Sequence, residues 1–439
     1  MLIIFCRSVP LLPCFPHWII AHYFSLSHSA LTRSSFTSIS YPYPRYPYNA
    51  SDKREFKSCK FSLSNSFAQP LSMPELINKL KASADGGAEL LDLYHNHNLE
   101  YVPIGGSLDL RRDIARIIYD DELPAENILI TPGGQSAVQT AALAFTSRGV
   151  HSIVFTPGYQ STVESPQWAV GNAGVTKLRR RPENDWQVDP DELRGAIRPD
   201  TKFLILNEPY NPGGIVMDAA LQDEVVCICR ERGIVILCDE VYRLLEHDDA
   251  VRIPTMANAY ERGISAVTMS KPWGGCGITI GWVACRDEDM VQRMVDVAYF
   301  GSVCPSRASE IQGRMVLRVS DAILRERRDV ILENKALLQD FIENRYSEWF
   351  RWRRPNAGAI AFVKFVGPWT SEKLGDHLAE AGISVKPAYC FTDSVEGEVE
   401  DYFRVGFGER KMPLALEALG KFVDDHEESW RAVMATNGE

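Results

Sequence analysis

Residues 203–214, FLILNEPYNPGG, form a short apolar run that leads directly into a polar turn rich in proline and glycine. The same pattern recurs at residues 235–243, VILCDEVYR, and at residues 266–275, AVTMSKPWGG. Uninterrupted short apolar runs are typical of strands that are buried on both faces. The polar residues that follow these strands are Asn211, Asp239 and Lys271. Ligands of α/β sheets bind at the carboxyl ends of the strands, so this part of the chain predicts a site at one sheet edge.

Further apolar runs predict more strands of the same sheet, and amphipathic segments between them predict helices. The additional strands are expected at residues 128–130, 153–155 and 282–284, and the helices at residues 108–119, 136–145 and 220–232. Strands that alternate with helices predict crossover connections and a mostly parallel sheet with helices on both faces. We therefore expect a three-layer α/β domain.

The pattern changes after Pro305. Residues 308–342 read as helical, residues 359–365 as a strand, and a final helix begins at Pro413. These features predict a smaller C-terminal α+β domain. The expected division of the chain is an N-terminal extension over residues 1–70, an N-terminal arm over 72–98, a large domain over 99–305 and a small domain over 306–434.

The first 51 residues contain no Asp or Glu and are rich in serine, unlike the rest of the chain. Such a leader is typical of an organelle-targeting segment, but it is also compatible with disorder or with an incorrectly assigned start codon. The apolar run at residues 11–26 is short and is interrupted by Pro13 and Pro16, so it is a poor membrane span. We expect a cytoplasmic protein, with import into an organelle as the alternative.

Composition limits the class of protein further. The chain has 439 residues, 45% of them hydrophobic, and a formal net charge of −11. This composition is typical of a globular protein, and the acidic balance argues against nucleic acid as a partner. The ten cysteines are scattered without the spacing of a zinc site, and we interpret them as reduced thiols.

Residues at the strand ends suggest the chemistry. Two glycines, Gly133 and Gly134, precede a helix whose first backbone N–H groups could bind a phosphate, although such a pair is more often an ordinary turn. Tyr159 could stack on a flat heterocycle or belong to the core. Asp239 is costly to bury unless it meets a cation, such as a protonated pyridine nitrogen. Lys271 is either a solvated side chain or, when desolvated, a nucleophilic amine that can form an imine.

The motifs NEPYNPGG, CDEVY and SK before a glycine-rich turn, in this order and spacing, resemble the signature of class I/II aminotransferases, which are pyridoxal-phosphate (PLP) enzymes of fold type I, like aspartate aminotransferase. The resemblance covers residues 72–434. It implies that Lys271 carries the cofactor as a Schiff base, the internal aldimine, and later moves a proton. It also implies the remaining cofactor ligands, namely Asp239 at the pyridine nitrogen, Asn211 and Tyr242 at the phenolic oxygen, Tyr159 on the ring face, and Gly134, Gln135 and Thr268 at the phosphate.

Two further segments match the family. EYVPIGG, residues 100–106, implies that Tyr101 reaches the phosphate of the neighbouring subunit's cofactor, and hence a homodimer with shared active sites. YFRVGFG, residues 402–408, implies that Arg404 binds the α-carboxylate of the substrate, with Asn211 beside it.

Two departures from the family pattern stand out. Thr279 occupies the position, eight residues after Lys271, where the family usually has a phosphate-binding arginine. LYHNHNLE, residues 93–100, stands where we expect the family's glycine-bearing N-terminal segment. The resemblance therefore predicts a PLP-dependent aminotransferase that acts on an L-amino acid and a 2-oxo acid. The alternative is a lyase or cyclase, including a carbon–sulfur lyase, on the same fold.

Overall fold

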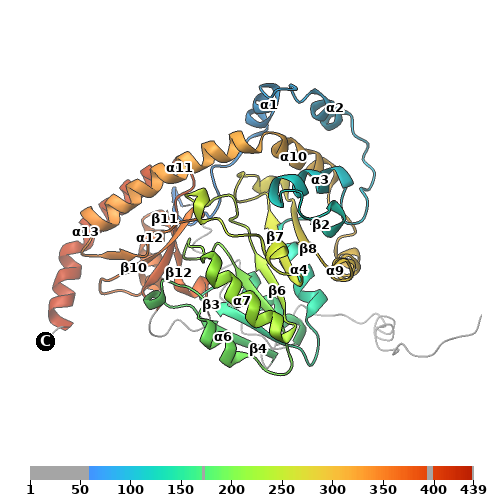
Figure 1. The fold of residues 1–439 in the computed structure, drawn as a ribbon. Helices are drawn as coiled ribbons and strands as arrows, with labels where there is room; N and C mark the ends of the chain where they lie inside the picture. The colour runs from blue at the N-terminus through green and yellow to red at the C-terminus, as the bar shows by residue number, and fades with distance from the viewer. Residues whose placement is uncertain (1–58, 171–173, 393–398, 438–439) are drawn as a thin grey trace, which may run out of the picture. The chain divides into compact units, whose positions relative to one another are not determined.

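The computed structural model describes residues 59–170, 174–392 and 399–437, which all belong to one unit of the chain (Figure 1). A seven-stranded sheet forms its centre, in the order β2-β8-β7-β6-β5-β3-β4. All neighbours are parallel except β8, which is antiparallel to both β2 and β7. The strands are β2 (Ile128–Thr131), β3 (His151–Thr156), β4 (Val175–Arg179), β5 (Thr201–Asn207), β6 (Val235–Asp239), β7 (Gly263–Thr268) and β8 (Gly281–Cys285).

Helices cover both faces of this sheet. Alternate residues of one strand enter different hydrophobic clusters: Leu237 packs with residues of α4 and α9, whereas Ile236 packs with residues of α6 and α7. This alternation follows from the period of two in a strand. The predicted three-layer α/β arrangement is confirmed. The helices around this sheet are α3 (Leu108–Ile118), α4 (Gly134–Phe145), α5 (Gln160–Val170), α6 (Pro190–Ala196), α7 (Ala219–Arg232), α8 (Met256–Ala259), α9 (Glu288–Gly301) and α10 (Arg307–Arg318).

A second, four-stranded sheet follows in the C-terminal part, in the order β12-β13-β10-β9. It shares a hydrophobic cluster with the long helices α11 and α13, which run beside β10 in Figure 1. Its strands are β9 (Phe350–Trp352), β10 (Ile360–Phe365), β12 (Lys386–Pro387) and β13 (Tyr402–Gly406), and the nearby helices are α11 (Ser320–Asp340), α12 (Ser371–Glu380) and α13 (Met412–Asn437).

The expected N-terminal extension ends earlier than predicted. Residues 1–58 lie outside the described part of the chain, but β1 (Phe61–Ser62) pairs with β11 (Ile383–Ser384). Leu63 and Ala68 are completely buried, and both belong to the cluster around the C-terminal sheet. Residues 59–70 are therefore part of the folded unit, because their apolar side chains are needed to fill that core. The expected arm over 72–98 carries α1 (Met73–Lys81) and α2 (Ala88–Asn96).

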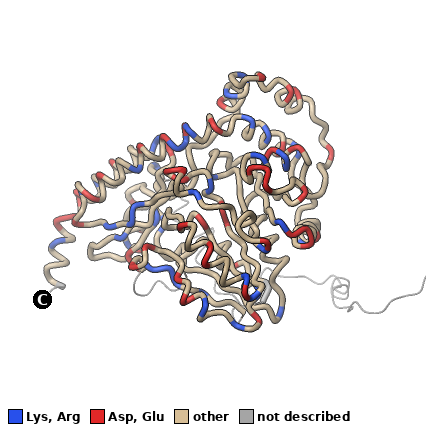
Figure 2. Tube along the Cα trace, in the orientation of Figure 1, with Lys and Arg blue, Asp and Glu red and all other residues tan. Residues whose placement is uncertain are grey.

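Acidic and basic residues are interspersed along the chain, as Figure 2 shows. Along α11, for example, Arg325, Glu326 and Arg327 follow one another. Among the described residues, no helix is both long enough and apolar enough to cross a membrane.

Candidate active site

The polar residues at the ends of the central strands lie on one face of the sheet. Asn207 pairs in register with Asp239, and Asp239 pairs with Ala266, two residues before Thr268. Side chains two residues apart on a strand point to the same face, so Asn207, Asp239 and Thr268 emerge together. The Asn207 side chain donates a hydrogen bond to the backbone oxygen of Asp239, 2.8 Å away, and fixes the ends of β5 and β6 to each other.

The amino end of α4 lies beside this face. Gly133 has φ +89° and is the cap residue of α4, without a side chain that binds the first N–H groups of the helix. A Cβ on Gly134 would be 3.1 Å from Cβ of Thr268, so glycine allows the helix start to approach β7. Gln135 donates to the Tyr159 hydroxyl at 2.6 Å. The four residues that the sequence assigned to one ligand, Gly134, Gln135, Tyr159 and Thr268, are thus brought together.

Thr268 is already engaged. Its hydroxyl donates to the backbone oxygen of Ile280 at 3.0 Å and lies 3.1 Å from the hydroxyl of Ser270. Because a phosphate oxygen needs a donor, the Ser270 hydroxyl is an additional candidate at this end of the site. Ser270 was not predicted from the sequence, although its position one residue before Lys271 is a usable signal.

Thr279 faces the same helix start. Its Cγ2 would lie 3.6 Å from a Cβ placed on Gly133. Its φ is +57°, a conformation that a β-branched residue adopts only under strain. Position 279 therefore borders the candidate phosphate site, and the residue there brings a hydroxyl and no positive charge.

Asp239 is buried, and its Oδ1 has no hydrogen-bond partner among the described residues. Burial raises the pKa of this carboxyl to about 7, while the backbone N–H of Val241 and the charge of Lys271 oppose the shift. A buried carboxylate with a free oxygen is favourable only if a cation meets it. The Asp239 side chain is thus suited to a protonated ring nitrogen.

Tyr242 is a second buried polar group of the site. Its hydroxyl has no hydrogen bond of good geometry in the described part of the chain, although the Ser66 hydroxyl is close enough to lower its pKa. Burial raises its pKa to about 12, against the opposing effects of Arg404 and the Ser66 hydroxyl. The phenol therefore stays neutral and is available as a donor to an anionic oxygen.

Lys271 is partly buried, and its Nζ donates to the hydroxyl of Ser66 at 3.0 Å. Burial lowers the pKa of the amine to about 8, and the positive charge of Arg404 acts in the same direction. Asp239 and Cys276 oppose this shift. An amine with this pKa is neutral in a large fraction of molecules near pH 8, which is what a nucleophile requires.

Arg404 is buried at the other end of the site. Its guanidinium donates to Oδ1 of Asn211 at 3.0 Å and to the backbone oxygen of Ser64 at 2.8 Å, and its Cζ lies 5.2 Å from the centre of the Phe391 ring. Asn211 is held by its own backbone N–H, which donates to the Asn207 side chain at 2.7 Å. The structure thus brings Arg404 and Asn211 into direct contact.

The segment that borders Lys271 and Arg404 is Leu63–Gln69, which we call the N-terminal strap. The backbone N–H of Ala68 donates to the Lys271 carbonyl oxygen at 3.1 Å, and that of Gly406 donates to the Leu63 oxygen at 2.6 Å. The expectation that LYHNHNLE supplies this N-terminal segment is wrong, since residues 88–96 form α2 and His97 bonds to the carbonyl oxygen of Tyr94. The polar composition of residues 93–100 suggested this segment, whereas the strap itself carries no strong sequence motif.

Tyr101 lies apart from the other candidate residues. Its side chain is 84% exposed, and Leu99, two residues before it, is 96% exposed. The described contacts of this single chain do not place Tyr101 against any ligand residue, and its role stays a prediction.

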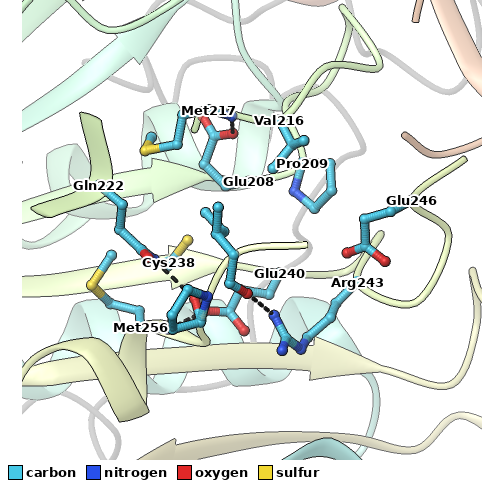
Figure 3. A pocket seen from close by; sticks show the side chains of 12 residues that line it. Glu208, Pro209, Val216, Met217, Gln222, Cys238, Glu240, Arg243, Glu246 and Met256 are labelled. Carbon is cyan, nitrogen blue, oxygen red and sulfur yellow. Dashed lines mark hydrogen bonds between the residues drawn. The ribbon is translucent and has the colours of Figure 1, made fainter. Parts of the chain in front are cut away.

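A small cavity lies behind the end of β6 (Figure 3). Cys238 and Glu240 line it, whereas Asp239 between them does not. Glu240 accepts hydrogen bonds from the backbone N–H of Met256 at 2.6 Å and from the hydroxyl of Ser265 at 3.0 Å. Because neighbouring strand residues point to opposite faces, this cavity belongs to the layer behind the sheet and not to the candidate site.

The residues present fit PLP. The unpartnered Asp239 oxygen suits a pyridinium N–H, the buried Tyr242 hydroxyl suits a phenolate oxygen, and the glycine-bordered start of α4 suits a phosphate. Lys271 supplies an amine of lowered pKa beside them. Each of these groups matches one functional group of PLP.

Comparison with known proteins gives a consistent result. The model of the family described as aminotransferase class I and II matches residues 66–419. An aspartate aminotransferase from Pyrococcus horikoshii is 26% identical over 73% of this chain and 81% of its own length. The kynurenine–oxoglutarate transaminase 1 of Mus musculus is 29% identical, but the match spans 42% of this chain and less than half, 46%, of that protein.

A solved structure agrees with the fold. A PLP-dependent aminotransferase from Streptococcus suis superimposes with a TM-score of 0.76 at 26% identity, covering 84% of this chain and 94% of that one. The family match begins at residue 66, within the strap, and so includes residues 66–71, which precede the predicted start of the resemblance at residue 72.

Proposed function

Since the chain belongs to the class I and II aminotransferase family, and is a PLP-dependent transferase, we propose that it moves an amino group from an L-amino acid to a 2-oxo acid, with Lys271 as the cofactor-binding residue. The observation that carries this proposal is the convergence of a low-pKa lysine, a buried acid and a buried arginine. Lys271 and Asp239 influence each other's pKa, and Arg404 lowers that of Lys271.

When bound, PLP supplies an aldehyde that bonds to amines and a conjugated ring that stabilises negative charge at the substrate α-carbon. Asp239 would hold the ring nitrogen protonated. Asn211 and Tyr242 would donate to the phenolic oxygen, and Tyr159 would cover the ring face. The backbone N–H groups of Gly134 and Gln135, with the hydroxyls of Thr268 and Ser270, would bind the phosphate.

The substrate carboxylate would meet Arg404. The guanidinium is held at one edge by Asn211 and at another by the Ser64 carbonyl oxygen. A carboxylate that binds it gains a charge-assisted hydrogen bond in a buried environment, where such bonds are strong. Lys386 pairs with Arg404 across β12 and β13 and adds a second positive charge to this part of the molecule.

Lys271 would also move the proton. As a free amine it would accept the proton that leaves the substrate α-carbon, and its pKa of about 8 keeps both protonation states accessible near neutral pH. Asp239 would keep its charge through its pairing with the ring nitrogen.

We further propose a homodimer in which Tyr101 of one subunit reaches the phosphate bound by the other. Leu99, Tyr101, Ile104, Tyr299 and Phe300 are large apolar side chains that are exposed in the single chain. Exposed apolar side chains of this size favour an interface.

The Lys271→Ala variant tests the proposal. Purified wild type should show the absorption of a lysine-bound cofactor and should convert a 2-oxo acid in a screen of amino donors, and Lys271→Ala should lose both. Lys335→Ala is a matched control, since Lys335 is another partly buried lysine of lowered pKa, located beside His247. Its absorption should be that of wild type. Loss of the band in both variants would contradict the assignment to Lys271.

The same assay distinguishes transfer from lyase or cyclase chemistry. Transfer converts the cofactor to its amine form when amino donor is added alone. Release of ammonia or of a cyclised product, with the cofactor unchanged, would replace the proposed reaction while leaving Lys271 as its anchor.

A further inference from the structure

The N-terminal strap brings one side chain into hydrogen-bond contact with the reactive amine. We propose that Ser66 is a positioning residue of the active site, which holds Nζ of Lys271 through its hydroxyl while the strap backbone holds Arg404. The proposal deepens the function proposed above and rests on it. Two hydrogen bonds support it: Lys271 Nζ lies 3.0 Å from Ser66 Oγ, and the Arg404 guanidinium lies 2.8 Å from the Ser64 carbonyl oxygen.

The strap is fixed independently of the Ser66 side chain. Its backbone is bonded to Ser384, Gly406 and Lys271, through Leu63 and Ala68. Leu63 and Ala68 are also completely buried. Removal of one hydroxyl at position 66 therefore leaves the anchors of the strap in place.

Close packing fixes the path of the strap. A Cβ on Gly406 would overlap the carbonyl oxygen of Asn65, and a Cβ on Gly408 would overlap that of Phe67. A Cβ on Gly274, three residues after Lys271, would overlap the carbonyl oxygen of Gln69. The backbone on both sides of Ser66 thus packs closely against glycines. This packing fixes the distance between the Ser66 side chain and Lys271.

The chemical consequence concerns the free amine. A lysine has three rotatable donors on a flexible stem, so its nitrogen needs a partner to point in one direction. The Ser66 hydroxyl accepts a hydrogen bond from the ammonium and can donate to the lone pair of the neutral amine. It can therefore hold Nζ in place in both protonation states, which a proton carrier must adopt in turn.

The first test measures Lys271 without relying on the cofactor. In the full chain freed of PLP, the rate of Lys271 acetylation by acetic anhydride is followed against pH by peptide mass spectrometry. Ser66→Ala removes an acceptor from a partly buried ammonium, so the midpoint should move down by roughly half a pH unit or more. Ser66→Thr, which keeps the hydroxyl, should restore the wild-type midpoint.

The second test uses the holoenzyme. Ser66→Ala should lower kcat by about tenfold with KM changed by less than about threefold, because the lost contact acts on the amine and not on substrate binding. Ser62→Ala is the matched control: Ser62 directly precedes the strap, and its hydroxyl lies 3.4 Å from that of Ser64, away from Lys271 and Arg404. It should leave kcat and the midpoint unchanged.

The outcomes separate the two proposals. A Ser66→Ala variant that matches Ser62→Ala in both measurements would overturn the role of Ser66. Wild type that lacks transferase activity, together with a shifted midpoint in Ser66→Ala, would overturn the proposed function but support the Ser66–Lys271 contact. A loss of kcat that Ser66→Thr does not restore would also overturn the proposal.

Discussion

At the scale of single residues, the site contains ionisable groups whose pKa values are shifted toward neutrality by burial. Burial raises the pKa of Asp239 to about 7 and lowers that of Lys271 to about 8. Among the described residues, neither group forms an ion pair. Such arrangements are costly for a fold and are concentrated at functional sites.

The sign of the Asp239 effect on stability follows from linkage. The pKa of this carboxyl is higher in the folded chain, about 7, than its ordinary value of 3.8. Its contribution to stability is therefore complete below about pH 4 and is lost as the pH rises through about 7. Lys271 behaves in the opposite way: its contribution is present above its ordinary pKa of 10.5 and is lost as the pH falls through about 8.

We predict that Asp239→Asn stabilises the cofactor-free protein at pH 8 and weakens cofactor binding. The substitution removes a buried charge, so the melting temperature at pH 8 should rise by roughly a few degrees, with little change near pH 4. The affinity for PLP should fall by about tenfold or more, because a buried ion pair loses one partner. Thermal unfolding against pH and cofactor titration measure the two effects.

Glu240→Gln is the matched control for this prediction. Glu240 is the next residue, is equally buried, and burial raises its pKa to about 7 as well. It lines the cavity behind the sheet, so its substitution should change stability in the same direction but leave the PLP affinity unchanged. Equal losses of affinity in both variants would show that Asp239 has no specific contact with the cofactor.

At the scale of elements, the strap and β13 depend on each other. β13 contributes Arg404 to the site. Two residues later, Gly406 has no Cβ and so allows the strap backbone to pack directly against β13. The two elements are far apart in sequence, yet each limits the position of the other. The Arg404 end and the Lys271 end of the candidate site are therefore connected through the strap.

We predict that Gly406→Ala displaces the strap. The added methyl group would overlap the Asn65 carbonyl oxygen, so the variant should be less stable by about 1–3 kcal/mol or more and should lose activity. Gly195→Ala is the control, because nothing lies within 4 Å of a Cβ there and α6 should tolerate it. Denaturant unfolding and kcat are the measurements.

The double variant Gly406→Ala with Ser66→Ala sharpens this test. If Gly406→Ala moves the strap away from Lys271, removing the Ser66 hydroxyl should have little further effect on kcat. Fully additive losses would mean that the strap keeps its contact with Lys271 in Gly406→Ala.

At the scale of the whole molecule, the proposed dimer can be tested by mixing inactive subunits. Lys271→Ala chains lack the amine, and Tyr101→Ala chains should lack the phosphate contact in the partner's site. A mixed dimer contains one site with an intact Lys271 and the intact Tyr101 of the other subunit. Activity should therefore recover to about a quarter of the wild-type value after unfolding and refolding an equal mixture.

The absence of recovery, with mixed dimers shown by tagged subunits, would place each site within a single chain. Each variant refolded alone controls for recovery that does not depend on mixing. The large exposed side chains Leu99 and Phe300 should become protected in the dimer, which hydrogen exchange of their segments can measure.

Sequence alone determined the architecture of the central sheet and most of its polar edge. Apolar strands buried on both faces and the turns after them are local signals, so β5, β6 and β7 were predicted within a few residues. Asn211, Asp239 and Lys271 follow from the same signals, because each stands at the end of such a strand or within four residues after it. Strand β4, which is only half-buried and carries Lys177 and Arg179, gave no such signal and was missed.

Only the tertiary structure decided what lies against Lys271. The strap is a short segment of mixed polar and apolar residues whose position comes from distant partners, namely Gly406, Gly408 and Ser384. Contacts between residues more than 300 positions apart leave no local pattern, and a glycine that admits another backbone looks like any glycine in a sequence. The shifted pKa values of Lys271 and Asp239 could not be predicted from the sequence either, because they arise from burial by segments that are distant along the chain.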